Sequence, residues 1–311
     1  MATLEAEGID GSTLLGFLAA VGSLRLLTEA HSGARLWFDR CGDHAMLEAG
    51  RASSCDAVVE AIIERFRSPT RDRELGLLAE AEKPKDISAE MLEALSRAAR
   101  EHPQDGAFVA GLICDGLTKD KNSDKAAETI LCAANGSGHQ DMFTTMRDLR
   151  RLVTDEHVRS SLVKPWEFGD EVPPETKWMG DRKPTLRWDE GSERIYALRL
   201  RDPTDKIEPF RTQLGAYALA AAALPCFPVV PQRRGAATVS TNRESSTQVD
   251  FYWMLWERPA TLAMVKVMHA IGEALTDPAS ARRRGVYRLL RARRMTLDKG
   301  KLVFSPSEAV W

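Results

Sequence analysis

The stretch LLGFLAAVGSLRLLTEA, residues 14–30, decides the fold because it predicts a helix that is apolar on most of its sides. A helix with this pattern is buried in a core rather than laid on a surface. Asp10 or Ser12 is a candidate N-cap for it. Gly16 and Gly22 each weaken a helix by about 1 kcal/mol relative to alanine, so they indicate close packing against a neighbouring element.

The rest of the first half predicts mainly helices. ARLWFD (34–39) is typical of a short strand. Residues 54–100 predict helices, and GAFVAGLIC (106–114) predicts a short apolar strand or a buried segment. Residues 142–153 predict another amphipathic helix, and residues 154–162 continue as helix. The apolar stripes of the two amphipathic helices are Val58, Val59, Ile62, Ile63 and Phe66, and Met142, Met146, Leu149 and Val153.

After residue 185 the pattern changes to a mixture of helices and antiparallel strands. TLRWD (185–189) and RIYALRLRDP (194–203) predict strands, residues 210–224 an alanine-rich helix ended by Pro225, and residues 261–275 an amphipathic helix. Residues 235–256 and 287–304 predict hairpins, which turn at NRESS and at Asp298–Gly300. The predicted class is therefore α+β, with a mainly helical N-terminal half and a C-terminal half of helix and antiparallel sheet.

The segment PWEFGDEVPPETKWMGDRKP, rich in proline, glycine and charge, is the best candidate for a boundary. We expect a mainly helical region at 1–163, a linker or long surface loop at 164–185 and an α+β region at 186–311. One continuous domain is the alternative.

Composition excludes several classes of protein. Hydrophobic residues make up 43% and charged residues 28% of the 311 residues, with a formal net charge of −2, so the chain is globular and no bulk polycation. No apolar run is long enough to cross a membrane, and the acidic start predicts a cytoplasmic protein. The five cysteines form no CxxC pair, and HExxH and GxSxG are both missing. We therefore predict no metal site, no cofactor and no catalytic residues.

Seven arginines crowd into the segment ARRRGVYRLLRARR (281–294), and their guanidinium groups match phosphate oxygens. On a strand, Arg291 and Arg293 would share one face, with Arg288 and Arg294 on the other. At least one face would then meet water or an anion. A solvated edge strand protected by its charge is the alternative. The candidate nucleic-acid-binding residues are Arg282, Arg283, Arg284, Arg288, Arg291, Arg293 and Arg294, extended by Arg233, Arg234 and Arg243.

The loop NGSGHQ precedes the helix at 142 and is a candidate anion-binding loop. Its glycines allow positive φ, and backbone N–H groups at a helix N-terminus hold anions. It is no Walker loop, because GKS or GKT is missing. A flexible loop that only caps the helix is the alternative. The candidate residues are Gly136, Ser137, Gly138, His139 and Gln140.

Three stretches, in this order, resemble proteins of type I-G (formerly I-U) CRISPR loci, the large-subunit and helicase-nuclease-extension group. They are GIDGSTLLGFLAAVGSLRLL with ARLWF, ANGSGHQDMFTTMRDL, and LRWDEGSERIYALRLRDPTD with RTQLGAYALAAAALPCFPVVP. Leu14-Leu15 departs from the usual Pro-Leu of the group. The matching positions are Gly136–Gln140, Arg187–Asp189 and Arg194–Tyr196.

The resemblance implies a non-catalytic subunit or accessory protein of an RNA-guided DNA-targeting effector. In such systems base pairing reads the sequence, while protein subunits hold the backbones. The implied partners are crRNA, target DNA and other effector subunits. Two other classes stay open: an interaction module whose arginines meet an acidic partner, and a nuclease whose site assembles from distant residues.

Overall fold

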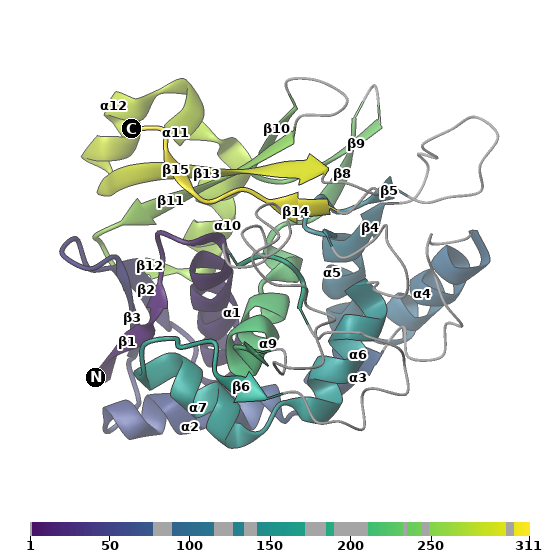
Figure 1. The fold of residues 1–311 in the computed structure, drawn as a ribbon, viewed down its shortest axis with the longest axis horizontal. Coiled ribbons are helices and arrows are strands. Elements are labelled where there is room, and N and C mark those ends of the chain that lie inside the picture. Colours follow the sequence, from purple (N-terminus) through teal and green to yellow (C-terminus); the bar gives the residue numbers. More distant parts are fainter. Residues whose placement is uncertain are drawn as a thin grey trace.

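The computed structural model describes most of the chain. The described residues are 2–76, 89–114, 127–133, 142–171, 185–189, 211–232, 235–243, 249–296 and 302–311. They form an α+β fold, as predicted, with more helix in the N-terminal half and the larger sheet in the C-terminal half (Figure 1). No described helix combines the length and apolar character needed to cross a bilayer.

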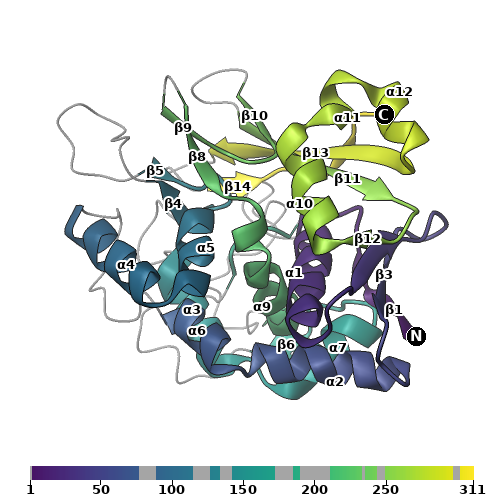
Figure 2. The ribbon, with the colours of Figure 1, turned by 180° about the vertical axis from the view of Figure 1, so that it is seen from behind.

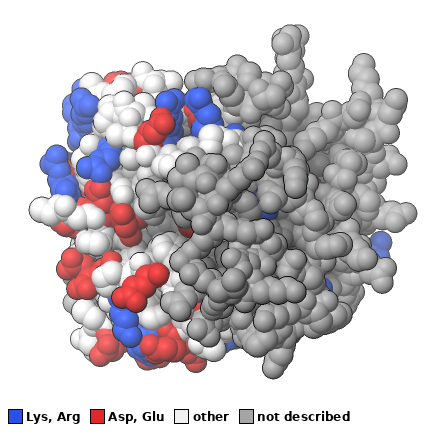
Figure 3. All heavy atoms as spheres, viewed as in Figure 1, with Lys and Arg blue, Asp and Glu red and all other residues white. Residues whose placement is uncertain are grey.

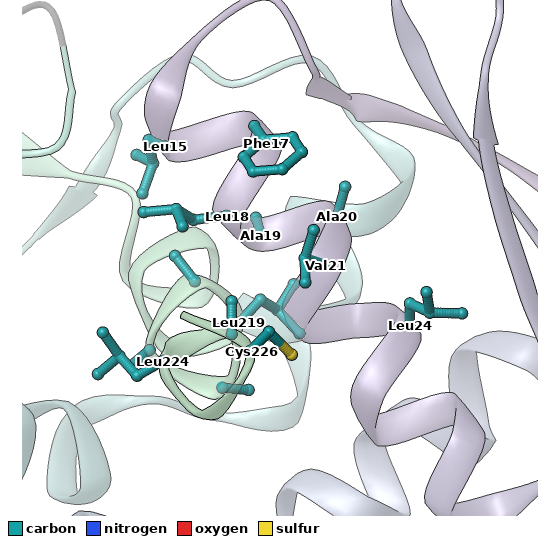
Figure 4. Close-up of a cluster of buried hydrophobic side chains, with 14 of the residues drawn as sticks. Leu15, Phe17, Leu18, Ala19, Ala20, Val21, Leu24, Leu219, Leu224 and Cys226 are labelled. Atoms are coloured by element: carbon teal, nitrogen blue, oxygen red, sulfur yellow. The ribbon is translucent and has the colours of Figure 1, made fainter. Parts of the chain in front are cut away.

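Two helices distant in sequence form the centre of the core. They are α1 (Leu14–Ala30) and α9 (Leu214–Ala222), whose side chains interlock in Figure 4. Every residue of α9 is buried. A Cβ on Gly22 would lie 1.8 Å from the carbonyl oxygen of Leu219, so only glycine permits this approach. The predicted close packing at Gly22 is therefore confirmed.

The start of α1 differs from its prediction. Its N-cap is Thr13, whose Oγ1 accepts a hydrogen bond from the backbone N–H of Gly16 (3.1 Å). Asp10 instead accepts from the backbone N–H of Ser12 (2.8 Å) and so stabilises the turn before the helix. Gly16 meets the carbonyl of Asp10 in this turn, not a neighbouring helix.

The first sheet flanks α1 and joins both halves of the chain. Its order is β1 (Ala2–Asp10), β3 (His44–Ala49), β2 (Arg35–Phe38) and β12 (Ala260–Thr261), all antiparallel. The expected linker lies partly outside the described residues, and the domain division stays a prediction. The residues before and after it nevertheless share one hydrophobic core.

In the described part of the first half, six further helices lie below and to one side of the central pair in Figures 1 and 2. The two predicted apolar stripes are buried, as expected. The segment 106–114 was expected to be a strand or a buried segment; it is mostly helix, with only Ile113–Cys114 in a strand (β4) that pairs with β5 (Ala127–Glu128). The helices are α2 (Cys55–Phe66), α3 (Pro69–Gly76), α4 (Ala89–Glu101), α5 (Pro103–Leu112), α6 (Met142–Leu152) and α7 (Asp155–Val163).

The second sheet covers the other end of α1 and α9, at the top of Figure 1. Its order is β10, β11, β13, β14, and β15 also pairs with β13. The predicted hairpin at 287–304 is confirmed in its antiparallel pairing, and that at 235–256 only in part, because Thr241–Arg243 pair with β11 whereas Gly235–Thr238 pair with Val229–Gln232. Residues 244–248 and 297–301, between the paired strands, lie outside the described residues. The strands are β10 (Thr241–Arg243), β11 (Val249–Trp256), β13 (Val286–Thr296), β14 (Leu302–Phe304) and β15 (Glu308–Ala309).

Shorter elements complete the fold. Helices α10 (Leu262–Ile271), α11 (Glu273–Thr276) and α12 (Pro278–Arg283) connect β12 to β13. The 3-10 helix η2 (Leu224–Cys226) follows α9 at the predicted proline. Two small antiparallel sheets pair β6 (Asp170–Glu171) with β7 (Arg211–Thr212), and β8 (Val229–Gln232) with β9 (Gly235–Thr238).

The strand predicted at 185–189 is wrong. Arg187 has a φ of 58°, and this left-handed conformation interrupts an extended strand. Its neighbours turn into the core, where Trp188 donates a hydrogen bond from Nε1 to the carbonyl of Leu131 (2.8 Å). The second strand predicted here, 194–203, lies outside the described residues.

Candidate basic interaction surface

The arginines of β13 face carboxylates of the protein itself. Arg293 donates from Nε and Nη2 to the two oxygens of Asp250 (2.7 and 3.0 Å), and Asp250 is only 1% exposed. Arg291 lies on the same face, as expected, and pairs with Glu308 at 2.9 Å and with Asp250 at 3.5 Å. The charge of these two side chains is largely satisfied within the sheet.

The arginines on the opposite face of β13 also contact groups of the protein itself. Arg288 forms an ion pair with Asp43, and Arg294 approaches the carbonyl of Ile130 at 3.5 Å. Strand β13 lies between β11 and the β14 and β15 strands, so the edge-strand alternative is wrong. Whether Arg288, Arg291, Arg293 and Arg294 also contact phosphate stays a prediction.

The three consecutive arginines before β13 are exposed. Arg282, Arg283 and Arg284 end the short helix α12, and Arg282 stacks over the ring of Trp311 with 4.6 Å from Cζ to the centroid. Figure 3 shows Lys and Arg side chains gathered at the upper left, where Figure 1 places α12. This part of the arginine segment therefore presents its charge to solvent.

A second segment, the β11–β12 turn, adds Arg258. Gly285 follows α12 with a φ of +94°, and a Cβ there would lie 3.0 Å from Cγ of Arg258. Glycine is required at this turn for both its backbone conformation and its lack of a side chain. Arg258 is exposed and packs directly beside the end of α12.

A third segment, the β2–β3 loop, adds Arg40. Its guanidinium lies over the ring of Tyr287 (5.5 Å) and pairs with Glu257 at 3.1 Å. Tyr287 is held in place by a hydrogen bond from its hydroxyl to Asp43 (2.8 Å). Burial, and then this hydrogen bond, raise the pKa of Tyr287 far above its usual value, so the hydroxyl stays a donor.

We call these five exposed arginines the basic corner: Arg40, Arg258, Arg282, Arg283 and Arg284. Glu257 is an exposed carboxylate at the corner, where it pairs with Arg40, while Asp43 is buried and already paired. Guanidinium groups favour an anion with several oxygens, such as a phosphate. Sequence reasoning missed Arg40 and Arg258, because they come from loops and only the tertiary fold brings them to α12.

The structure places none of the other predicted site residues at the basic corner. Arg233, Arg234, the loop Gly136–Gln140 and the segment Arg194–Tyr196 lie outside the described residues; Arg243 belongs to β10 by its backbone. Arg187 and Trp188 are buried. Arg187 donates from Nη1 to the carbonyl of Leu302 (3.1 Å), so this motif ties the core to β14.

A buried ionic cluster between α1, α3 and α9 has a structural role. Glu74 accepts from Arg71 (2.7 Å) and from Arg25 (3.1 Å), and the two arginines also donate to the carbonyls of Ala218 and Ala222 at 3.3 and 3.1 Å. These carbonyls lie in the C-terminal half of α9, toward the helix end where positive charge is favoured. Burial opposes the ionisation of Glu74, but the guanidiniums outweigh it and hold its pKa below the usual value.

In the part of the chain that the structure describes, no three His, Cys, Asp or Glu side chains are grouped to hold a metal ion. Comparison with known proteins adds no further constraint: no protein-family model matches the chain, and no curated protein matches it significantly.

Proposed function

We propose that this chain is a non-catalytic subunit or accessory protein of a type I-G-like CRISPR effector, and that it contacts the nucleic-acid backbone through the basic corner. The observation that carries the proposal is the assembly of five exposed arginines from three separate segments. The ordered sequence motifs that resemble this CRISPR group supply the biological setting.

Charge placement supports a backbone contact without sequence readout. Phosphate contacts position a protein on nucleic acid and carry no direct sequence information. The basic corner offers five exposed guanidinium groups with forked donors, while Arg288, Arg291 and Arg293 of β13 are engaged by Asp43, Asp250 and Glu308. The partners would be crRNA or target DNA and other effector subunits, and the setting would be the cytoplasm.

The proposal is tested by fluorescence anisotropy with labelled single- and double-stranded RNA and DNA. One variant removes a charge from each segment of the corner: Arg40→Gln, Arg258→Gln and Arg283→Gln. A matched control changes three exposed arginines elsewhere: Arg51→Gln, Arg100→Gln and Arg151→Gln. At low salt we expect the corner variant to bind at least about tenfold more weakly and the control to bind like the wild type.

Two results would refute the backbone contact. One is a folded wild-type protein that binds none of the four nucleic acids at low salt. The other is an equal loss of affinity in the corner variant and the control, because nonspecific attraction by total charge would then explain the binding.

A further inference from the structure

An aromatic ring backs an arginine at two places of the basic corner. Cζ of Arg282 lies 4.6 Å from the centroid of the Trp311 ring, and Cζ of Arg40 lies 5.5 Å from that of the Tyr287 ring. Guanidinium groups stack on aromatic faces at such distances. Both arginines are exposed and both rings are half-buried. Each pair therefore presents to solvent a guanidinium that is held against a ring.

Such pairs are concentrated at this corner. Among the described residues, three of the five contacts between an arginine and an aromatic ring involve Tyr287 or Trp311. The rings of the other two contacts belong to Phe66 and Phe108, which are buried and closed to a ligand. In the part of the chain that the structure describes, a ring-backed arginine is thus open to a ligand only at the basic corner.

The Arg282–Trp311 pair is the better placed of the two to receive a ligand. Its distance is the shorter one, and Trp311, the end marked C in Figure 1, lies beside α12. Arg40 is held by Glu257 at 3.1 Å, whereas no carboxylate of the described residues is paired with Arg282. The backbone of Trp311 is fixed, because its carbonyl accepts a hydrogen bond from the N–H of Leu289 in β13 (3.1 Å). A platform that is fixed before binding loses little entropy when a ligand stacks on it.

An unpaired nucleobase is the ligand that fits this pair. Bases of single strands stack on aromatic side chains and on guanidinium planes. In a duplex each base is paired and stacked between its neighbours, so its faces are closed to a protein unless the base is flipped out. The phosphate contacts of the corner serve both forms of nucleic acid. A stacking contact serves only a strand whose bases are unpaired.

We propose that the basic corner is a binding site for single-stranded nucleic acid, in which an unpaired base stacks on the Arg282–Trp311 pair. This inference rests on the proposed backbone contact and adds to it the class of nucleic acid that the corner takes. The other arginines of the corner hold the phosphates on either side of the stacked base. Stacking tolerates every base, so the contact reads no sequence.

The test uses fluorescence anisotropy with two labelled strands of the same length and charge, a deoxythymidine oligomer and an abasic oligomer that lacks the bases. Their phosphates are the same, so the ratio of the two affinities measures the contacts to the bases. The wild type should bind the thymidine oligomer at least about fivefold more tightly, the lower end of the scale of one stacked base.

One variant removes the stacking pair but keeps its charge: Arg282→Lys with Trp311→Leu. It should bring the ratio of affinities close to one, while its affinity for the abasic oligomer stays near that of the wild type because the corner keeps its charges. Trp311→Phe keeps a ring and should keep the ratio. A matched control, Arg151→Lys with Trp166→Leu, changes another exposed arginine near a helix end and another half-buried tryptophan, and should also keep the ratio.

Equal binding of both oligomers by the wild type overturns the stacking contact and leaves the phosphate contact of the corner intact. The same conclusion follows if Arg282→Lys with Trp311→Leu keeps the wild-type ratio. If the wild type binds neither oligomer at low salt, the backbone contact and the stacking contact fail together. The affinity for the abasic oligomer therefore judges the phosphate contact, and the ratio of affinities judges the stacking.

Discussion

The arginines of one short segment have different roles because different groups face them. Arg293 meets a buried carboxylate directly across the strand pair, at the register position of Asp250, and Arg288 meets Asp43. Arg283, a few residues earlier, lies exposed at the end of a helix. The residue type therefore determines which groups a guanidinium can bind, and the neighbouring side chains determine which group it contacts.

His269 should make stability depend on pH. Burial lowers its pKa from 6.5 to about 3, so below pH 6.5 the unfolded chain takes up a proton that the folded chain does not. The free energy of unfolding then falls as pH falls, by about 1.4 kcal/mol per pH unit from this group. Urea unfolding between about pH 6 and pH 4 should show a loss about 2 kcal/mol smaller for His269→Phe than for the wild type. Parallel pH profiles would show that His269 does not titrate this way.

Neutralising the buried carboxylate of Glu74 should lower the stability of the protein strongly. The Glu74 side chain has no exposed area and holds two guanidiniums. Glu74→Gln leaves the buried guanidinium of Arg71 without the carboxylate that it pairs with, and we expect it to lower the free energy of unfolding by about 3–5 kcal/mol. Glu60→Gln, which breaks the exposed pair with Arg159, should cost less than about 1 kcal/mol. Equal effects in urea unfolding would mean that the buried cluster is not an ionic one.

At the scale of elements, the sequence patterns predicted the main helices and the pairings of β10 with β11 and of β13 with β14. The buried stripes of α2 and α6 follow from 3.6-residue periodicity, and the bounds of α1 match the apolar stretch at 14–30. Strand β1 was missed: Leu4 and Ala6 point inward and Glu5 and Glu7 outward, an alternation read only as an acidic start. The strand at 185–189 failed because the left-handed φ of Arg187 leaves no signature in residue type.

The contact between α1 and α9 gives a prediction for Gly22. Gly22→Ala places a methyl group against the backbone of Leu219, and we expect it to destabilise the protein by about 1–3 kcal/mol or more. Gly106→Ala is the matched control in another helix, where a Cβ meets only Ala99 at an ordinary 3.6 Å. It should be neutral or stabilise by up to about 1 kcal/mol. A Gly22→Ala protein as stable as the wild type would mean that the two helices are farther apart.

At the scale of the whole molecule, segments from both halves meet at one surface. The β2–β3 loop, the β11–β12 turn and the end of α12 together form the basic corner, held by Tyr287 and by the space that Gly285 leaves. The sequence identified the arginine-rich segment but not these companions, since neither loop carries a motif. Nor did it separate the exposed arginines from those paired by distant aspartates.

The most direct test of the basic corner is the salt dependence of its binding. For each protein, the logarithm of the affinity for a labelled single strand is plotted against the logarithm of salt concentration. Each lost phosphate contact lowers the slope by about 0.7 for single strands. The corner variant should therefore show a slope about 2 units shallower than that of the wild type, and the control variant (Arg51→Gln, Arg100→Gln and Arg151→Gln) should keep the wild-type slope. If the corner variant keeps the full slope, the phosphate contacts lie elsewhere and the central claim is wrong.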